Sequence, residues 1–239
     1  MPASTHKSIC FIGDQPHPGD LNLTKYCLEK SELPHHASIL DVGCGSGKTV
    51  QFLRESGYQA LGIDLHNLQD LPAMPEGSLY ARANWYDIPA CTDFFDAVFA
   101  ECTFSLIQAL DRHLSEVRRV LKPDGKIIFH GLYARNNLSG PSLKSIGQDC
   151  SLKYLRNQPQ LTQEIQAAGF KILCWEDQSQ VLKEKGNYLH NLCWGPHLFG
   201  QTNPQDPPVP QESEKDIFDF FLAIAQLKIG YYVAIALKK

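Results

Sequence analysis

Three glycines at alternating positions, Gly43, Gly45 and Gly47, constrain the fold of this chain more than any other feature. They follow the short apolar segment Ser38–Val42 and precede a helical pattern from Lys48 to Glu55. Glycine lets the backbone turn sharply and lets a ligand approach main-chain N–H groups without an intervening Cβ. The pattern therefore predicts a strand, a tight turn and a helix whose N-terminus faces a ligand.

Further apolar segments alternate with helical patterns along the chain, which is typical of a parallel sheet covered on both faces. The sequence thus predicts an α/β fold, a doubly wound Rossmann-like sheet of seven mostly parallel strands with helices on both faces. The other expected strands are 60–65, 78–83, 95–100, 126–132, 170–176 and 230–237, and the other expected helices are 106–121, 161–168 and 214–228.

The chain has 239 residues, of which 43% are hydrophobic, and this is enough for one core. We expect a single domain over residues 1–239. Within it we expect an N-terminal cap helix (1–34), a ligand-binding core (35–132), a lid or loop (133–160) and the C-terminal part of the sheet (161–239). A proline-rich segment, 177–214, is expected to wrap around the outside.

Charge and hydropathy exclude several classes of partner. The formal net charge is −4, so the chain offers no basic surface for nucleic acid or anionic lipid. No segment approaches the roughly 20 apolar residues of a membrane helix, and the N-terminus has no secretory pattern. We expect a cytoplasmic protein without a membrane or nucleic-acid partner. The oligomeric state stays open.

The glycine turn fits two phosphate-binding patterns incompletely. A P-loop would need glycine where this chain has Val42, and the dinucleotide fingerprint would need glycine where it has Lys48. An NAD-dependent dehydrogenase remains open only if Lys48 is tolerated. Two carboxylates flank the turn instead, Asp41 before it and Asp64 at the end of the next strand, and they favour a cationic, hydroxyl-rich ligand over phosphates.

Five segments of the chain together resemble the motifs of the class I S-adenosylmethionine-dependent methyltransferases. The resemblance covers residues 35 to 132 well and implies S-adenosyl-L-methionine as cofactor, with S-adenosyl-L-homocysteine as product. It also implies the family's seven-stranded sheet with an antiparallel last strand. The segments are Ile39–Gly47, Gly62–Leu65, Asn84–Pro89, Phe95–Val98 and Arg119–Gly125.

The resemblance implies a role for each matched position. The turn would lie under the methionine moiety with Asp41 near its amino group, Asp64 would accept from both ribose hydroxyls, and Leu65 would pack on the adenine. The implied cofactor-binding residues are Asp41, Gly43, Cys44, Gly45, Gly47, Asp64, Leu65, Asn84, Trp85 and Glu101.

The adenine contact departs from the family pattern. Many relatives carry a Gly-Asp-Ala triplet before a Leu-Pro, and here Ile88-Pro89 sets the register. Asn84 then takes the acid's position and Trp85 follows it, so an amide oxygen replaces the carboxylate. Asp87 is the alternative if the register slips.

The acceptor side is less determined, because acceptor contacts come from variable loops. Glu101, Cys102 and Tyr133 are the candidate catalytic residues, with His130 and Arg135 as further acceptor contacts. Glu101 could close the methionine end, act as a base or begin a helix. The Asn/Asp-Pro-Pro-Tyr/Phe signature of adenine, cytosine and glutamine N-methylation is absent, so a small-molecule acceptor is expected.

Several alternatives stay open. The chain could bind S-adenosylmethionine without turnover, or methylate arsenite through thiols at Cys102, Cys150, Cys174 and Cys193. The eight cysteines contain no Cys-x-x-Cys motif, and no resident metal is expected. The segment His17–Thr24 predicts a turn that leads into a helix ending near Lys30, which could cover the cofactor or only pack on the sheet.

Overall fold

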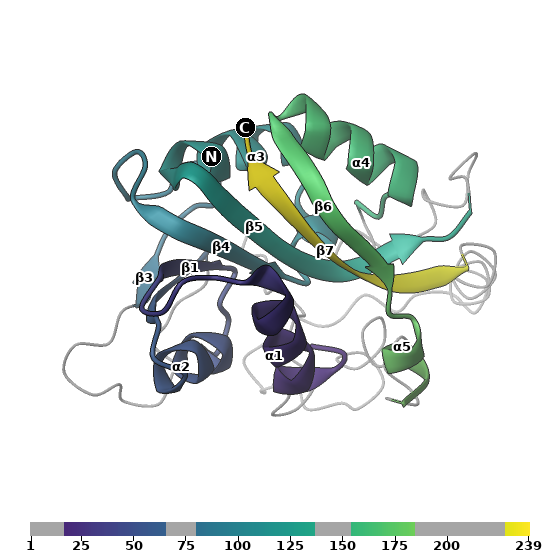
Figure 1. Ribbon diagram of the computed structural model, residues 1–239. Helices are drawn as coiled ribbons and strands as arrows, with labels where there is room; N and C mark the ends of the chain where they lie inside the picture. Colours follow the sequence, from purple (N-terminus) through teal and green to yellow (C-terminus); the bar gives the residue numbers. More distant parts are fainter. Residues whose placement is uncertain (1–16, 66–79, 137–153, 185–227) are drawn as a thin grey trace, which may run out of the picture.

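The computed structural model describes residues 17–65, 80–136, 154–184 and 228–239, which form a single mixed sheet with helices on both faces (Figure 1). The strands are β1 (Ser38–Val42), β2 (Gln59–Asp64), β3 (Tyr80–Arg82), β4 (Phe95–Glu101), β5 (Leu121–Ala134), β6 (Phe170–Asp177) and β7 (Ile229–Lys238). The α-helices are α1 (Asp20–Ser31), α2 (Lys48–Glu55), α3 (Leu110–Val120), α4 (Gln158–Ala167) and α5 (Gln180–Glu184).

The seven strands have the order β3-β2-β1-β4-β5-β7-β6. Neighbours from β3 to β5 pair in parallel, whereas β7 runs antiparallel to both β5 and β6. The strand order reverses between β1 and β4, and ligands of such sheets bind outside the carboxyl ends of the strands at this point. The predicted fold class is confirmed, including the antiparallel last strand.

The two faces of the sheet carry separate cores (Figure 1). Helices α1, α2 and α5 cover one face, where α1 contributes Leu23 and Cys27. Helices α3 and α4 cover the other, where apolar residues of α3 recur every three or four positions from Leu110 to Val120. Strands β4 and β5 send alternate side chains into each core, so the sheet is buried on both sides.

The predicted helix over 106–121 is wrong at its start. Residues Phe104–Leu106 form a 3-10 turn, and α3 begins only at Leu110. The reason is a tertiary contact: the guanidinium of Arg156 donates to the carbonyls of Phe104, Ile107 and Gln108, each at 3.2 Å. These carbonyls therefore bond to a distant side chain rather than to the N–H groups of a longer helix.

The boundaries of the other elements differ less from the predicted ones. Strand β5 begins at Leu121 rather than at 126, because Leu121 already pairs with Phe95 of β4, and after a shift in register the pairing continues from Lys126 and Ala97. Helix α4 begins at Gln158, inside the range expected as a lid, where Asn157 and Gln160 form a capping box. Helix α5 falls inside the expected wrap. Most of the lid and the wrap, and the expected helix 214–228, lie outside the described residues.

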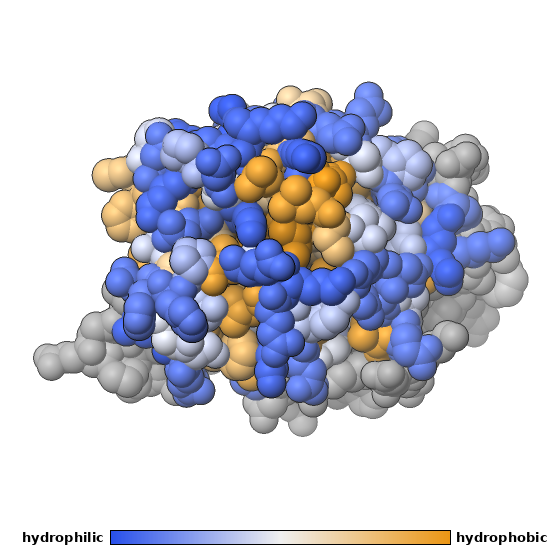
Figure 2. Space-filling model, in the orientation of Figure 1, coloured by the Kyte–Doolittle hydropathy of each residue, from blue (hydrophilic) through white to orange (hydrophobic). Residues whose placement is uncertain are grey.

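Figure 2 shows apolar side chains at the centre of this view, over β7 and the edge strand β6. On β6 the side chain of Leu173 is 47% exposed. None of the helices in the four described ranges is long and apolar enough to cross a membrane.

Candidate functional site

The glycine turn lies at the carboxyl end of β1, as predicted, and all three glycines have positive φ values (79° for Gly43, 51° for Gly45 and 77° for Gly47). The N–H groups of Gly43 and Cys44 both donate to the carbonyl of Ile63, which fixes the turn against β2. A Cβ on Gly43 would lie 2.4 Å from Cγ2 of Thr103. Glycine is required here by conformation and by space.

Asp64 ends β2 directly beside the turn. Its Oδ2 accepts from the N–H of Gly45 at 3.0 Å, and the half-buried Leu65 follows it. Across the turn, the hydroxyl of Tyr80 donates to the carbonyl of Gly47 at 2.8 Å. Burial raises the pKa of Tyr80 to about 12, so this hydroxyl stays protonated. The turn, β2 and β3 thus form one connected frame around the Asp64 carboxylate.

Three acidic side chains, Asp41, Asp64 and Glu101, lie near one another beside the glycine turn. Asp41 is 2% exposed, and burial together with the charges of Glu101 and Asp64 raises its pKa well above the ordinary value. The site therefore places several carboxyl groups beside the start of α2, and a positively charged ligand would relieve the repulsion that raises the pKa of Asp41. Carboxylate oxygens accept hydrogen bonds from hydroxyls and attract a positive centre, and both groups are present in S-adenosylmethionine.

Glu101 contacts four polar side chains. Its Oε1 accepts from Thr24 at 2.9 Å and contacts Nε2 of His130 at 2.9 Å. Its Oε2 accepts from Thr49 at 2.6 Å and lies 3.2 Å from Nε2 of His17. The side chain is only 7% exposed. Glu101 thus joins the start of α1, the start of α2, β4 and β5.

The two histidines and Glu101 shift one another's pKa values. Burial would raise the pKa of Glu101, but the charges of His17 and His130 and their hydrogen bonds hold it well below the ordinary value. Burial opposes protonation of His17, yet Glu101 outweighs it and the pKa of His17 rises. For His130 burial is the larger effect and its pKa falls. The carboxylate is therefore ionised and one imidazole beside it stays neutral.

Cys102 follows Glu101 at the mouth of the site and has a φ of 54°, an uncommon value for a residue with a side chain. Its Sγ lies 2.9 Å from the hydroxyl of Tyr231, which is also 2.8 Å from Nδ1 of His130. Cys102 is thus linked to Glu101 through Tyr231 and His130.

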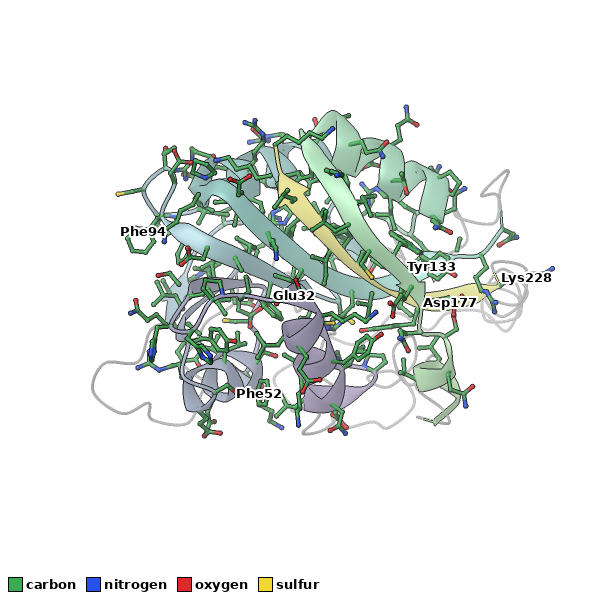
Figure 3. All side chains as sticks on the ribbon, in the orientation of Figure 1. Glu32, Phe52, Phe94, Tyr133, Asp177 and Lys228 are labelled. Carbon is green, nitrogen blue, oxygen red and sulfur yellow. The ribbon has the colours of Figure 1, made fainter. Side chains whose placement is uncertain are left out.

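Tyr133, the third candidate catalytic residue, lies on the opposite face of the sheet. Its ring packs against Trp175 and Tyr232 in the core under α3 and α4, and its hydroxyl donates to Asp177 at 2.6 Å (Figure 3). Burial and this carboxylate raise the pKa of Tyr133 to about 12. Arg135 lies 3.6 Å from the same carboxylate. The structure does not bring Tyr133 and Arg135 together with Glu101.

The predicted adenine contacts lie in a turn after β3. Asn84 is exposed, and its side-chain oxygen accepts from the N–H of Tyr86 at 2.9 Å. The carbonyl of the half-buried Trp85 is 3.1 Å from Nδ1 of His113. Asp87 pairs with Asn84 through the backbone and is exposed. The amide oxygen of Asn84 thus serves its own turn here, and its adenine role stays a prediction.

The sequence did not single out Thr24 or Thr49 as contacts of Glu101, and it placed His17 only in a turn. The sequence feature that could have indicated these contacts is the polar segment before α1. Nothing in that segment showed that its side chains would reach the ends of β4 and β5. The described residues give little support to the arsenite-methylation alternative, which needs several thiols together. The thiol of Cys174 lies on β6, 3.4 Å from the carboxylate of Glu176. Cys150 and Cys193 lie outside the described residues.

Comparison with known proteins supports the sequence resemblance. Residues 40–129 match the methyltransferase domain family. The chain is 26% identical over 198 residues to sterol 4-C-methyltransferase strm-1 of Caenorhabditis elegans, an alignment that covers 77% of this chain and 58% of that protein. The chain therefore spans somewhat more than half the length of this curated relative.

Solved structures share the fold. A protein described as a putative sarcosine dimethylglycine methyltransferase from Galdieria sulphuraria superposes with a TM-score of 0.69 at 14% identity, covering 97% of this chain and 93% of its own. Phosphoethanolamine N-methyltransferase 2 of Haemonchus contortus, solved with S-adenosyl-L-methionine, gives 0.66 at 19% identity, covering 96% and 55%. Residues 40–129, which hold the glycine turn and the acidic site, thus match a methyltransferase domain, and the chain is similar to methyltransferases in sequence and in fold over most of its length.

Proposed function

We propose that this protein transfers a methyl group from S-adenosylmethionine to a small-molecule acceptor in the cytoplasm. The observation that carries the proposal is the glycine turn set among Asp41, Asp64 and Glu101 at the carboxyl ends of β1, β2 and β4. Carboxylates accept hydrogen bonds from hydroxyls and attract a positive centre, so these three acids fit that cofactor.

The residues divide the work of holding the cofactor. Asp41 and the turn, whose N–H groups at Gly43, Cys44 and Gly45 bond within the protein, would lie beside the methionine end, and Asp64 would accept from the ribose hydroxyls. Leu65 and Trp85 would line the adenine. Glu101 would support the site from beneath rather than contact the cofactor, because its oxygens already contact two threonines and two histidines.

The bound cofactor supplies a methyl group already activated by the sulfonium charge. The protein's part is therefore mainly to bring the acceptor into line and to exclude water, which can account for most of a rate enhancement. The mouth of the site is formed by Cys102, Thr103 and the 3-10 turn that Arg156 holds. His130 lies beneath this mouth, where Nδ1 contacts the hydroxyl of Tyr231 and Nε2 contacts Glu101, so it would hold these two side chains in place.

A small acceptor is supported by charge and by the relatives. The net charge of −4 disfavours nucleic acid. The relatives' names include a sterol and, for a solved structure, sarcosine and dimethylglycine as substrates. Because the chain spans little more than half of the sterol enzyme, the acceptor's identity is left to experiment.

The proposal is tested first by calorimetric titration with S-adenosylmethionine, S-adenosylhomocysteine and NAD in parallel. We expect micromolar binding of the first two and none of NAD. Incubation with methyl-labelled cofactor and a panel of amines, sterols and carboxylates then tests transfer. Binding without transfer to any acceptor would favour a cofactor-binding module, and binding of NAD alone would overturn the methyltransferase proposal.

A further inference from the structure

A buried cluster of three side chains converges from separate parts of the fold. His17 precedes α1, Glu101 ends β4 and His130 lies in β5. One ring nitrogen of each histidine and a carboxylate oxygen of Glu101 all lie within 4.8 Å of one another. Within the residues that the structure describes, no other group of histidine, cysteine and carboxylate side chains has this spacing.

Hydrogen bonds fix how His17 presents itself to this cluster. Its Nδ1 is 2.9 Å from the carbonyl of Pro18, and a carbonyl only accepts, so Nδ1 carries a hydrogen. In the neutral imidazole, Nε2 then holds a lone pair. Around Nε2 lie Oε2 of Glu101 at 3.2 Å and the hydroxyl oxygen of Thr24 at 3.1 Å. Thr24 donates its single hydrogen to Glu101, so Nε2 meets acceptors on both sides.

This arrangement needs a positive centre between His17 and Glu101, either a proton or a metal ion. A proton on Nε2 serves His17 alone. A metal ion can serve both histidines and the carboxylate at once, and the rings lie close together with centroids 4.4 Å apart. The separations of 2.9 Å and 3.2 Å from nitrogen to carboxylate oxygen match those of neighbouring ligands on one metal at bond lengths of about 2.1 Å.

The outer contacts are those that metal-binding histidines usually have. Such histidines donate their other ring N–H to a carbonyl, carboxylate or similar partner, which orients the ring. His17 does so to Pro18, and Nδ1 of His130 lies 2.8 Å from the hydroxyl of Tyr231. Thr24 and Thr49 hold the carboxylate of Glu101 in the same way.

We propose that His17, Glu101 and His130 form a binding site for a divalent transition-metal ion, with zinc, cobalt(II) or iron(II) as the fitting class. Two imidazoles and one carboxylate favour these ions over Mg²⁺ or Ca²⁺, which prefer oxygen ligands. Three protein ligands leave at least one position open. That position would take an oxygen, nitrogen or sulfur atom of the methyl acceptor, and this role alone rests on the proposed function.

Cobalt(II) and zinc are the probes. Tag-free, reduced, chelator-treated protein is titrated with Co²⁺ while its visible d–d spectrum is recorded, and Zn²⁺ binding is measured by calorimetry. We expect about one equivalent of metal per chain, with a cobalt spectrum free of the near-ultraviolet thiolate band that cysteine ligation would give. A thiolate band would assign the metal to the cysteines and overturn the proposal.

Isosteric variants locate the site. We expect Glu101→Gln, His17→Gln and His130→Gln each to weaken metal binding by more than about 100-fold, and Tyr231→Phe, which removes only an outer contact, by about tenfold. His113→Gln changes a third buried histidine, which lies outside the cluster, and this variant should bind metal like the parent. A cooperative thermal transition by circular dichroism shows that each variant is folded, and Tyr231→Phe keeps the test valid if a ligand variant does not fold.

Unchanged binding in the three ligand variants, or no saturable binding in the parent, would overturn the proposal and leave the cluster as a proton-bridged ion pair that fastens α1 to the sheet. S-adenosylhomocysteine is titrated into the same chelator-treated protein. If the cofactor binds and the metal does not, the metal site is wrong and the methyltransferase proposal is unaffected. If the metal binds and the cofactor does not, the methyltransferase proposal is wrong and the metal site is unaffected.

Discussion

At the scale of single residues, Asp64 is the carboxylate that the proposed function assigns to the ribose hydroxyls of the cofactor. We expect Asp64→Asn to weaken binding of S-adenosylhomocysteine by about 1 to 3 kcal/mol, because the variant loses a charged acceptor for ligand hydroxyls. Calorimetry measures the change. Asp111→Asn, an exposed acid in the first turn of α3, serves as the control and should leave the affinity unchanged. An unaltered affinity in Asp64→Asn would remove this residue from the site.

His113 makes stability depend on pH. It is fully buried, and burial lowers its pKa from 6.5 to about 4. Its Nδ1 bonds to the carbonyl of Trp85, whereas Nε2 has no partner among the residues that the structure describes, which fits a neutral ring. In the unfolded chain the ring takes up a proton near pH 6.5. The unfolded state therefore binds more protons, and stability is complete above that pH and falls as the pH drops toward 4.

We expect this one group to remove roughly 3 kcal/mol of stability between pH 7 and pH 4. The test compares urea unfolding of the parent with that of His113→Gln at several pH values, because other acids titrate equally in both proteins. The variant should lose less stability on acidification. Parallel pH curves for the two proteins would contradict the assignment.

At the scale of elements, Arg156 fixes the backbone at the mouth of the site, although it follows that segment by about fifty residues in the sequence. Its side chain is 12% exposed and bonds three carbonyls between Phe104 and Gln108 as well as Glu164 of α4. We expect Arg156→Lys to destabilise the protein by about 1 to 3 kcal/mol, since an ammonium cannot span the same acceptors. Urea unfolding measures the loss.

Arg118→Lys is the matched control, because Arg118 is bonded to the exposed end of the chain at Lys239. It should change stability by less than about 0.5 kcal/mol. Hydrogen exchange adds a local measurement: the amides of 104–109 should exchange faster in Arg156→Lys and not in Arg118→Lys. Equal losses of stability and equal rates of hydrogen exchange in the two variants would show that Arg156 does not stabilise this turn specifically.

The elements also show where sequence reasoning succeeds and where it fails. The glycine turn, the strands beside it and Asp64 could be predicted, because local backbone geometry and the order of strands determine them. The start of α3 could not, since Arg156 replaces the helical partners of Phe104 and Ile107. The convergence of His17, Glu101 and His130 could not either, because it depends on how α1 docks on β4 and β5.

At the scale of the whole molecule, one sheet separates two cores, so a ligand at the carboxyl ends of β1 and β2 contacts only part of the structure. Strands β4 and β5 carry side chains into both cores and link that part to β7 and β6. If the sheet unfolds as one unit, ligand binding must stabilise the distant strands as much as the near ones.

We therefore expect S-adenosylhomocysteine at about 100 times its dissociation constant to stabilise the protein by about 2.7 kcal/mol. The single thermal transition should rise by roughly 5 to 10 °C. Hydrogen exchange at the same ligand concentration should slow by the same factor in the slowest amides of β6 and β7 as in those of β1. In Asp64→Asn, at a concentration that saturates only the parent, both effects should shrink together. Protection confined to β1 and β2 would instead mean that β7 and β6 open separately, and that the antiparallel edge of the sheet is energetically independent of the cofactor site.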